Sequence, residues 1–175
     1  MLKLAGALLI LISAAGLGFR MAARWRQRVR ELEQLRQMVY FLKGEIVYSR
    51  APLAEALEQA GKRSGGELGR FFEKTAEGIR RNDGECLYEI WSEAMEALEK
   101  GERETALTGE DLLQLKGLGR NLGYLDVDMQ ERLLLLYLEQ LDLTIAGLRE
   151  QQREKCRLYA SMGVMGGIFL VIVLT

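Results

Sequence analysis

The chain has 175 residues, with 24 Lys plus Arg against 25 Asp plus Glu, a net charge of −1 and no histidine. The absence of histidine excludes imidazole-based catalytic triads and His-containing zinc sites, and two cysteines are too few for a four-thiolate site. We therefore predict a protein that is not an enzyme, with no catalytic residue, no metal ligand and no cofactor. Metal-dependent chemistry on clustered carboxylates is the enzymatic alternative.

The chain begins with an apolar segment, residues 4–19, that contains no charged residue. Its length approaches the roughly 20 residues of a membrane-spanning helix, although Ser13-Ala14-Ala15 also offers a plausible signal-peptide cleavage point. A basic cluster follows directly, and such a cluster favours a retained span because it resists translocation. We predict a transmembrane helix over residues 1–23 with these arginines at the cytoplasmic membrane edge: Arg20, Arg24, Arg26, Arg28 and Arg30.

The chain ends with a second uncharged segment, residues 158–175, for which we also predict a transmembrane helix. Basic residues precede it as well, namely Arg149 and the membrane-edge group Arg153, Lys155 and Arg157. Both basic clusters flank the same segment, so residues 24–157 are expected to form a cytoplasmic domain between two spans, with membrane lipid as a contact. Stripes of small residues predict close packing of the spans, within one chain or between copies: Ala14, Gly18, Ala22, Gly163 and Gly167.

The domain between the spans has the composition of an all-α protein, with one proline and abundant Leu, Ala, Glu, Arg and Gln. Its first helix, which runs to about Arg50, has apolar residues at alternating spacings of three and four: Leu32, Leu35, Val39, Leu42 and Ile46. The last helix, from Asp126 into the second span, has a matching seam: Leu134, Leu138, Leu141, Ile145 and Leu148. Since both helices start at the same membrane surface, we expect them to pair antiparallel as a stem.

Four shorter helices are predicted between the stem helices. Pro52 is expected at the first position of one helix. That helix is expected to end at Gly61 and the glycine-containing stretch that follows Gly61. The next helix ends at Asn82-Asp83-Gly84, and another runs from about Glu85 to Lys100. A further helix opens with Thr108 and Asp111 as a capping box and runs to about Leu122. The prediction is a compact bundle of about six helices with one core, flanked by two transmembrane helices.

Charge is unevenly distributed along the chain. Residues 31–148 hold 14 Lys plus Arg and 23 Asp plus Glu, a balance of −9, which argues against binding of nucleic acid. Ten acids between Asp83 and Asp111 face only Lys100 and Arg103. A solvated face is one interpretation, and a docking surface for a basic partner is the other. The candidate partner-binding residues share one side of a predicted helix: Glu85, Glu89, Glu93 and Glu96.

Several short motifs, in this order along the chain, resemble the stage III sporulation protein AB family. They are Leu42-Lys43-Gly44-Glu45-Ile46, Pro52-Leu53-Ala54-Glu55-Ala56-Leu57, Leu118-Gly119 with Leu122-Gly123, then Asp126 and Gln130, and finally Lys155, Tyr159, Ser161 and Gly163. That family is similar to the cytoplasmic domain of inner-membrane platform proteins of type II secretion and type IV pilus systems. Those platforms usually carry two copies of this domain, so a complete platform would need a second protomer or another subunit.

The resemblance implies a protein of the mother-cell membrane around the forespore, acting beside a secretion-type ATPase and other channel subunits. The function we expect is that of a non-enzymatic scaffold whose cytoplasmic face docks the ATPase, with a homo-oligomer possible. The alternative is a stand-alone membrane sensor or adaptor that signals through its helical stem and needs no ATPase.

Overall fold

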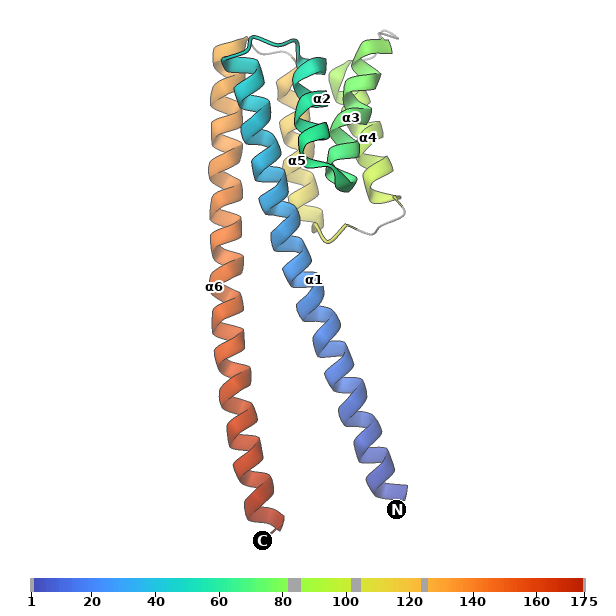
Figure 1. Cartoon of the computed structure of the whole chain (residues 1–175), viewed down its shortest axis with the longest axis vertical. Helices are drawn as coiled ribbons and strands as arrows, with labels where there is room; N and C mark the ends of the chain where they lie inside the picture. Colours follow the sequence, from blue (N-terminus) through green and yellow to red (C-terminus); the bar gives the residue numbers. More distant parts are fainter. Residues whose placement is uncertain (1, 82–85, 102–104, 124–125, 175) are drawn as a thin grey trace.

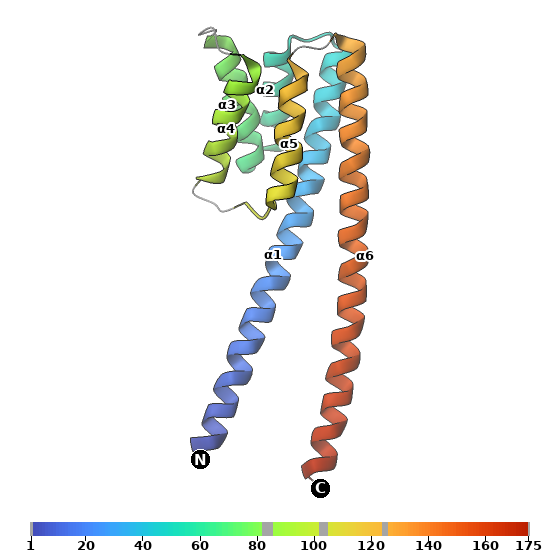
Figure 2. The same ribbon diagram turned by 180° about the vertical axis from the view of Figure 1, so that it is seen from behind.

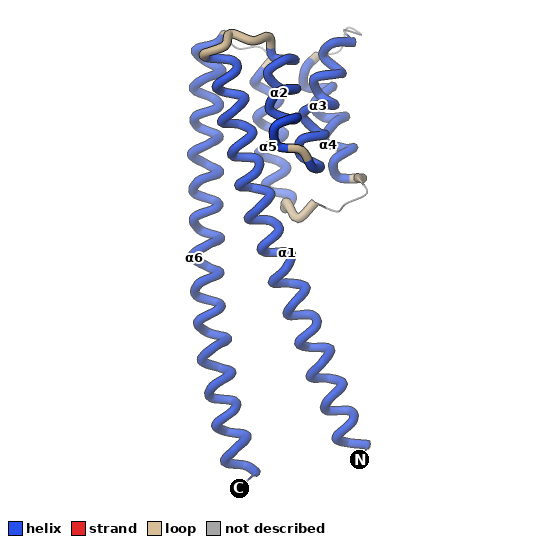
Figure 3. Tube along the Cα trace, in the orientation of Figure 1, coloured by secondary structure: helices blue, strands red, loops and turns tan. Residues whose placement is uncertain are grey.

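The structure, a computed structural model, contains six helices and no strand in the part of the chain that it describes (Figure 3). It describes the backbone of residues 2–81, 86–101, 105–123 and 126–174, and the side chains of residues 23–81, 86–101, 105–123 and 126–151. The all-α prediction is therefore confirmed. The helices are α1 (Leu2–Val47), α2 (Leu53–Ser64), α3 (Gly66–Arg81), α4 (Leu87–Glu99), α5 (Gly109–Leu122) and α6 (Val127–Leu174).

The two long helices, α1 and α6, lie side by side and antiparallel, as predicted for the stem (Figure 1). Both chain termini lie at the same end of the molecule, and the four short helices gather beside the opposite end of α1 (Figures 1 and 2). The α2–α3 hairpin packs on α1, α4 packs on α3, and α5 lies between α4 and α6. The short helices therefore form one lateral cluster on the stem.

The core confirms both predicted apolar seams. All ten seam residues of α1 and α6 are buried, and Leu35, Val39, Leu42 and Leu134 are wholly inaccessible to solvent. A repeat of three and four residues keeps one stripe of each helix facing its partner along the whole contact. This packing removes the leucine side chains of both seams from water. Burial of apolar surface is the main favourable term in folding.

An aromatic cluster joins α3 to α4 and α5. The rings of Phe71 and Trp91 meet edge to face with centroids 4.9 Å apart, and Phe72 packs beside both. The buried indole nitrogen of Trp91 donates a hydrogen bond to the carbonyl oxygen of Leu115, 3.1 Å away. Trp91 thus fixes α4 against α5 through both its ring and its polar atom.

Helix α2 ends within the stretch predicted to break it, but two details of its predicted ends were wrong. Gly61 does not end the helix: it is buried inside α2, and the chain leaves the helix at Gly65, where φ is +62°. Gly61 instead lets α2 approach α3, since a Cβ at this position would lie 2.7 Å from the carbonyl oxygen of Gly69. Pro52 caps α2, whose first residue is Leu53, because extended backbone at ψ 146° places the proline just outside the helix.

Within the described side chains, no helix has an apolar stretch long enough to cross a membrane. Apart from residue 23, the two predicted spans, 1–23 and 158–175, lie outside those side chains, as do their small residues Ala14, Gly18, Ala22, Gly163 and Gly167. The membrane spans and the domain boundaries at residues 24 and 157 stay predictions.

Substitution of Gly119 by alanine should destabilise the fold. A Cβ there would lie 2.3 Å from Trp91 Cγ, and overpacking of this kind costs about 1–3 kcal/mol. Gly117, two residues earlier in α5, is the matched control because its Cβ would meet nothing within 4 Å. Gly117→Ala should stabilise the protein by about 0.5–1 kcal/mol through helix propensity. Denaturant unfolding of the full chain in detergent, followed by circular dichroism, measures both, and equal effects of the two substitutions would contradict the packing.

Candidate functional site

The predicted acidic face lies on α4. Glu89, Glu93 and Glu96 are all exposed there, and Glu85 lies outside the described residues. Each of the three carboxylates has a partner within the chain. Glu89 Oε2 accepts a hydrogen bond from the Cys86 backbone nitrogen at 3.0 Å, while Glu93 and Glu96 form exposed ion pairs with Lys74 (3.6 Å) and Lys100 (3.1 Å).

These contacts give the three glutamates different roles. Glu89 belongs to the capping box that begins α4, so its position is set by the helix start. The ion pairs of Glu93 and Glu96 are exposed, and pairs of this kind contribute only about 0–1 kcal/mol. Glu93 and Glu96 can therefore exchange their present partners for a basic group of another protein at small cost.

Asp111, which the sequence analysis counted in the acidic stretch, does not lie on this surface. Its side chain is 2% exposed and receives a bidentate pair of hydrogen bonds from Arg28, with Nε 2.8 Å from Oδ2 and Nη2 2.9 Å from Oδ1. The backbone nitrogen and the hydroxyl of Thr108 each donate to Oδ2 at 2.8 Å. The capping interaction expected between Thr108 and Asp111 is thus present, and the same carboxylate also binds the stem.

Electrostatics keep Asp111 ionised in this position. Burial alone would raise the pKa of Asp111, but the hydrogen bonds from Arg28 and Thr108 outweigh it and hold the pKa below its ordinary value. Burial also raises the pKa of Tyr137 on α6, and the negative charge of Asp111 adds to that effect. The Tyr137 hydroxyl is buried without a hydrogen-bond partner among the described residues, so it stays neutral beside the ion pair.

Glu31 extends the polar contact between α1 and the start of α5. Its Oε2 accepts hydrogen bonds from the Thr105 hydroxyl at 2.7 Å and from the Ala106 backbone nitrogen at 2.9 Å. We call the group formed by Arg28, Glu31, Thr105, Thr108 and Asp111 the stem latch. It holds the segment that leads into α5 against α1, at the end of the short-helix cluster nearer the termini (Figure 2).

The predicted membrane-edge residues fall into three groups. Arg24, Arg26 and Arg30 are exposed on α1. Arg28, by contrast, is only 17% exposed, and its guanidinium is bound to Asp111 instead of pointing into solvent. The others lie outside the described side chains: Arg20, Arg153, Lys155 and Arg157. Contact of these residues with lipid stays a prediction.

The stem latch was not predicted, although part of its signal is present in the sequence. Arg28 stands four residues before Leu32 and seven before Leu35, so it continues the buried side of α1 toward the N-terminus. A basic residue on a buried stripe calls for an acidic partner. Its partner Asp111 was counted with the acidic stretch, because charge counting along the chain does not distinguish a buried acid from its exposed neighbours.

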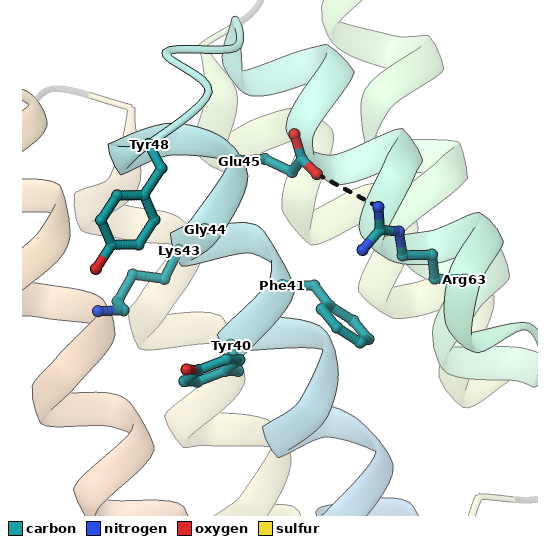
Figure 4. Close-up of a pocket in the computed structure, with 7 residues that line it drawn as sticks. All are labelled: Tyr40, Phe41, Lys43, Gly44, Glu45, Tyr48 and Arg63. Atoms are coloured by element: carbon teal, nitrogen blue, oxygen red, sulfur yellow. Dashed lines mark ion pairs between the residues drawn. The ribbon is translucent and has the colours of Figure 1, made fainter.

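A small hollow lies beside the C-terminal end of α1, remote from the termini (Figure 4). It has a volume of about 180 Å³, and Gly44 lies between Tyr40 and Tyr48 in its lining. On one side, Arg63 of α2 stacks on the Phe41 ring at 5.2 Å and pairs with Glu45 at 3.8 Å. Lys43 lies 5.9 Å from the centre of the Tyr48 ring on the other side. The described residues contain no cluster that could hold a metal ion.

Comparison with known proteins now identifies the family. A sequence profile of the stage III sporulation protein AB family matches residues 3–175. The chain belongs to this family. Stage III sporulation protein AB of Bacillus subtilis (strain 168) is 28% identical over 181 residues, and the match covers 99% of each chain. The resemblance seen in the sequence motifs is therefore confirmed, and a role in sporulation follows from the family.

A solved structure supports the fold of this stage III sporulation protein AB family member. The structure of Stage III sporulation protein AB (SpoIIIAB) matches with a TM-score of 0.64 at 23% identity, over 73% of this chain and 98% of that one. The likeness shows that the bundle of short helices on a two-helix stem is shared. The family description names a stage of sporulation and no chemical reaction.

Removal of Arg28 should destabilise the domain much more than removal of an exposed arginine on the same helix. Arg28→Ala leaves the buried Asp111 carboxylate without its counterion, and breaking such a pair costs about 3 kcal/mol. Arg36→Ala is the control, since its ion pair with Asp142 is about half exposed and should cost less than about 1 kcal/mol. Denaturant unfolding of both full-length variants measures the difference, and equal losses would show that the latch does not stabilise the bundle.

Proposed function

We propose that this protein is a membrane platform subunit of a secretion-like channel complex between mother cell and forespore, and that it docks a cytosolic secretion-type ATPase. Family membership supports the sporulation role, and the resemblance of the family to secretion and pilus platforms suggests the type of complex. The protein acts as a scaffold in this proposal, without chemistry of its own.

The observation that carries the proposal is the exposed carboxylate row on α4. Glu93 and Glu96 lie one turn apart on a helix whose other side is fixed by the buried Trp91 and Met95. A rigid helix that presents negative charge suits a basic surface on a partner, because complementary potentials speed and orient association. Tight packing of α4 on α3 and α5 would pass a push on this face to the rest of the bundle.

The stem supplies the second part of the proposed role. The first residues of α1 and the last residues of α6 lie at the same end of the molecule (Figure 1). This arrangement suits anchorage of both apolar segments in one membrane. The exposed arginines Arg24, Arg26 and Arg30 would then meet anionic headgroups, while the acidic domain is held away from them. In this proposal the protein lies in the mother-cell membrane, with residues 24–157 in the cytoplasm.

Binding of the ATPase to charge-reversed variants tests the proposal. The full chain in lipid nanodiscs should bind the secretion-type ATPase of the same genome, and Glu93→Lys with Glu96→Lys should weaken binding at least about tenfold at low salt. Glu89 is left intact because it caps α4. The control, Glu139→Lys with Glu150→Lys, makes the same charge change at exposed positions of α6 and should bind like the wild type.

The binding measurement is repeated at different salt concentrations and with different nucleotides. The difference between the α4 variant and the wild type should shrink as ionic strength rises, because exposed charges are screened. If the α4 variant bound the ATPase as tightly as the control variant, the docking surface would lie outside α4. Absence of binding by the wild type at every salt and nucleotide condition would contradict the platform proposal itself.

A further inference from the structure

Three ion pairs connect α1 to α6 along one side of the stem. The charged residues of α1 are three and seven positions apart, and those of α6 are eleven and seven positions apart. Each set therefore lies on one side of its helix, and we call the combined surface the stem face. The pairs are Glu33 with Arg149 at 2.6 Å, Arg36 with Asp142 at 2.5 Å, and Lys43 with Glu131 at 3.4 Å. Both members of the first two pairs are at least 39% exposed.

The signs of these charges follow an ordered pattern. Going from the termini toward the short-helix end, α1 carries a negative and then two positive charges, while α6 carries a positive and then two negative charges at the same levels. The stem face is therefore neutral as a whole. Each helix of the pair is also the electrostatic complement of the other at every level.

Apolar side chains lie between the charged levels. Tyr40 of α1 is 63% exposed and Leu135 of α6 is 47% exposed, and both lie between the Lys43–Glu131 and Arg36–Asp142 pairs. Tyr48, which is 77% exposed, lies just after the end of α1, five residues beyond Lys43. Tyr40, Leu135 and Tyr48 therefore form an apolar strip beside the charged levels.

Gly44 leaves open space in the middle of this apolar strip. A Cβ at Gly44 would meet no atom within 4 Å, so nothing in the chain itself requires glycine at this position. Glycine in a helix interior is less favourable than alanine. The hollow between Tyr40 and Tyr48 therefore offers room for a side chain from outside (Figure 4).

We propose that the stem face binds a second copy of this chain, related by a twofold axis parallel to the stem. Such an axis keeps every residue at its own level and places α1 of one copy against α6 of the other. Glu33 and Arg36 of one copy then meet the opposite charges of the second copy's α6 at the two exposed levels. The two pairs at each level form a square of alternating charge, in which no like charges face each other directly.

The same symmetry fits the remaining features of the face. Tyr40 and Leu135 lie between the same two charged levels, so Leu135 of the second copy faces Tyr40 and packs into the hollow beside Gly44. All four terminal ends of the pair point in one direction, because the axis runs along the stem. The α4 face stays accessible in both copies, since it lies across the short-helix cluster from α6 (Figure 1).

A charge-swap variant tests this contact without breaking the stem. Arg36→Asp with Asp142→Arg, combined with Glu33→Arg and Arg149→Glu, keeps both ion pairs within each chain but reverses their direction. Swapped chains still complement one another. A swapped chain beside a wild-type chain places like charges opposite each other at two levels, so mixed pairs are disfavoured.

The experiment uses the full chain in detergent micelles at low salt, with the two kinds of chain carrying different tags and pairing measured by native mass spectrometry. Wild-type chains and swapped chains should each form dimers, and mixed dimers should be at least about fivefold below their statistical share. Glu93→Lys, which reverses a charge outside the stem face, should mix freely with the wild type. A monomeric wild-type chain, or mixed dimers at the statistical share, would overturn the proposal.

A second variant tests the apolar contact. Gly44→Trp fills the hollow without meeting any atom near its Cβ, so helicity should be kept while dimer formation falls by at least about tenfold. Dimers of unchanged stability in this variant would place the contact elsewhere and overturn the proposal. Neither measurement contains the ATPase, so its outcome is separate from the test of ATPase docking.

Discussion

The antiparallel contact between α1 and α6 is the constraint on which the rest of the structure depends. Its two seams come from opposite ends of the chain, yet all ten of their leucine, isoleucine and valine side chains are buried. Once this contact forms, the short helices between the seams must return along the stem. Their order follows from short connections: α2 turns back onto α1, α3 pairs with α2, and α4 and α5 continue the layer until the chain re-enters the stem at α6.

Close contacts between helices determine how the short-helix cluster fits on this stem. Gly61 and Gly69 allow α2 and α3 to approach backbone to backbone, and Gly119 leaves room for the Trp91 ring between α4 and α5. The stem latch then joins the start of α5 back to α1 through Arg28 and Asp111. Charged residues thus have different roles. A buried pair orients α5, two exposed pairs lie on the stem face, and Glu93 and Glu96 lie on an outer surface.

Much of the fold could be predicted from the sequence, because apolar periodicity reports directly which side of a helix is buried. The ten seam residues and the start of α5 at Thr108 were found in this way. Gly61 was misread as a helix end because its role depends on Gly69 of another helix, which no local pattern reveals. The ion pair of Asp111 was missed for the same reason, since its partner Arg28 is 83 residues away in the chain. The ordered charges of the stem face likewise become visible only when α1 and α6 are placed together.

The central claim, that the stem is the stable element and the short helices are held on it, is tested most directly by hydrogen exchange of the full chain. The account predicts that the slowest amides lie in residues 32–46 and 134–148, where the seams are buried, and that α4 opens before them. If amides of α4 or of the α2–α3 hairpin exchanged more slowly than both seams, the short helices would form the stable core, and the stem could not be the element on which the rest depends.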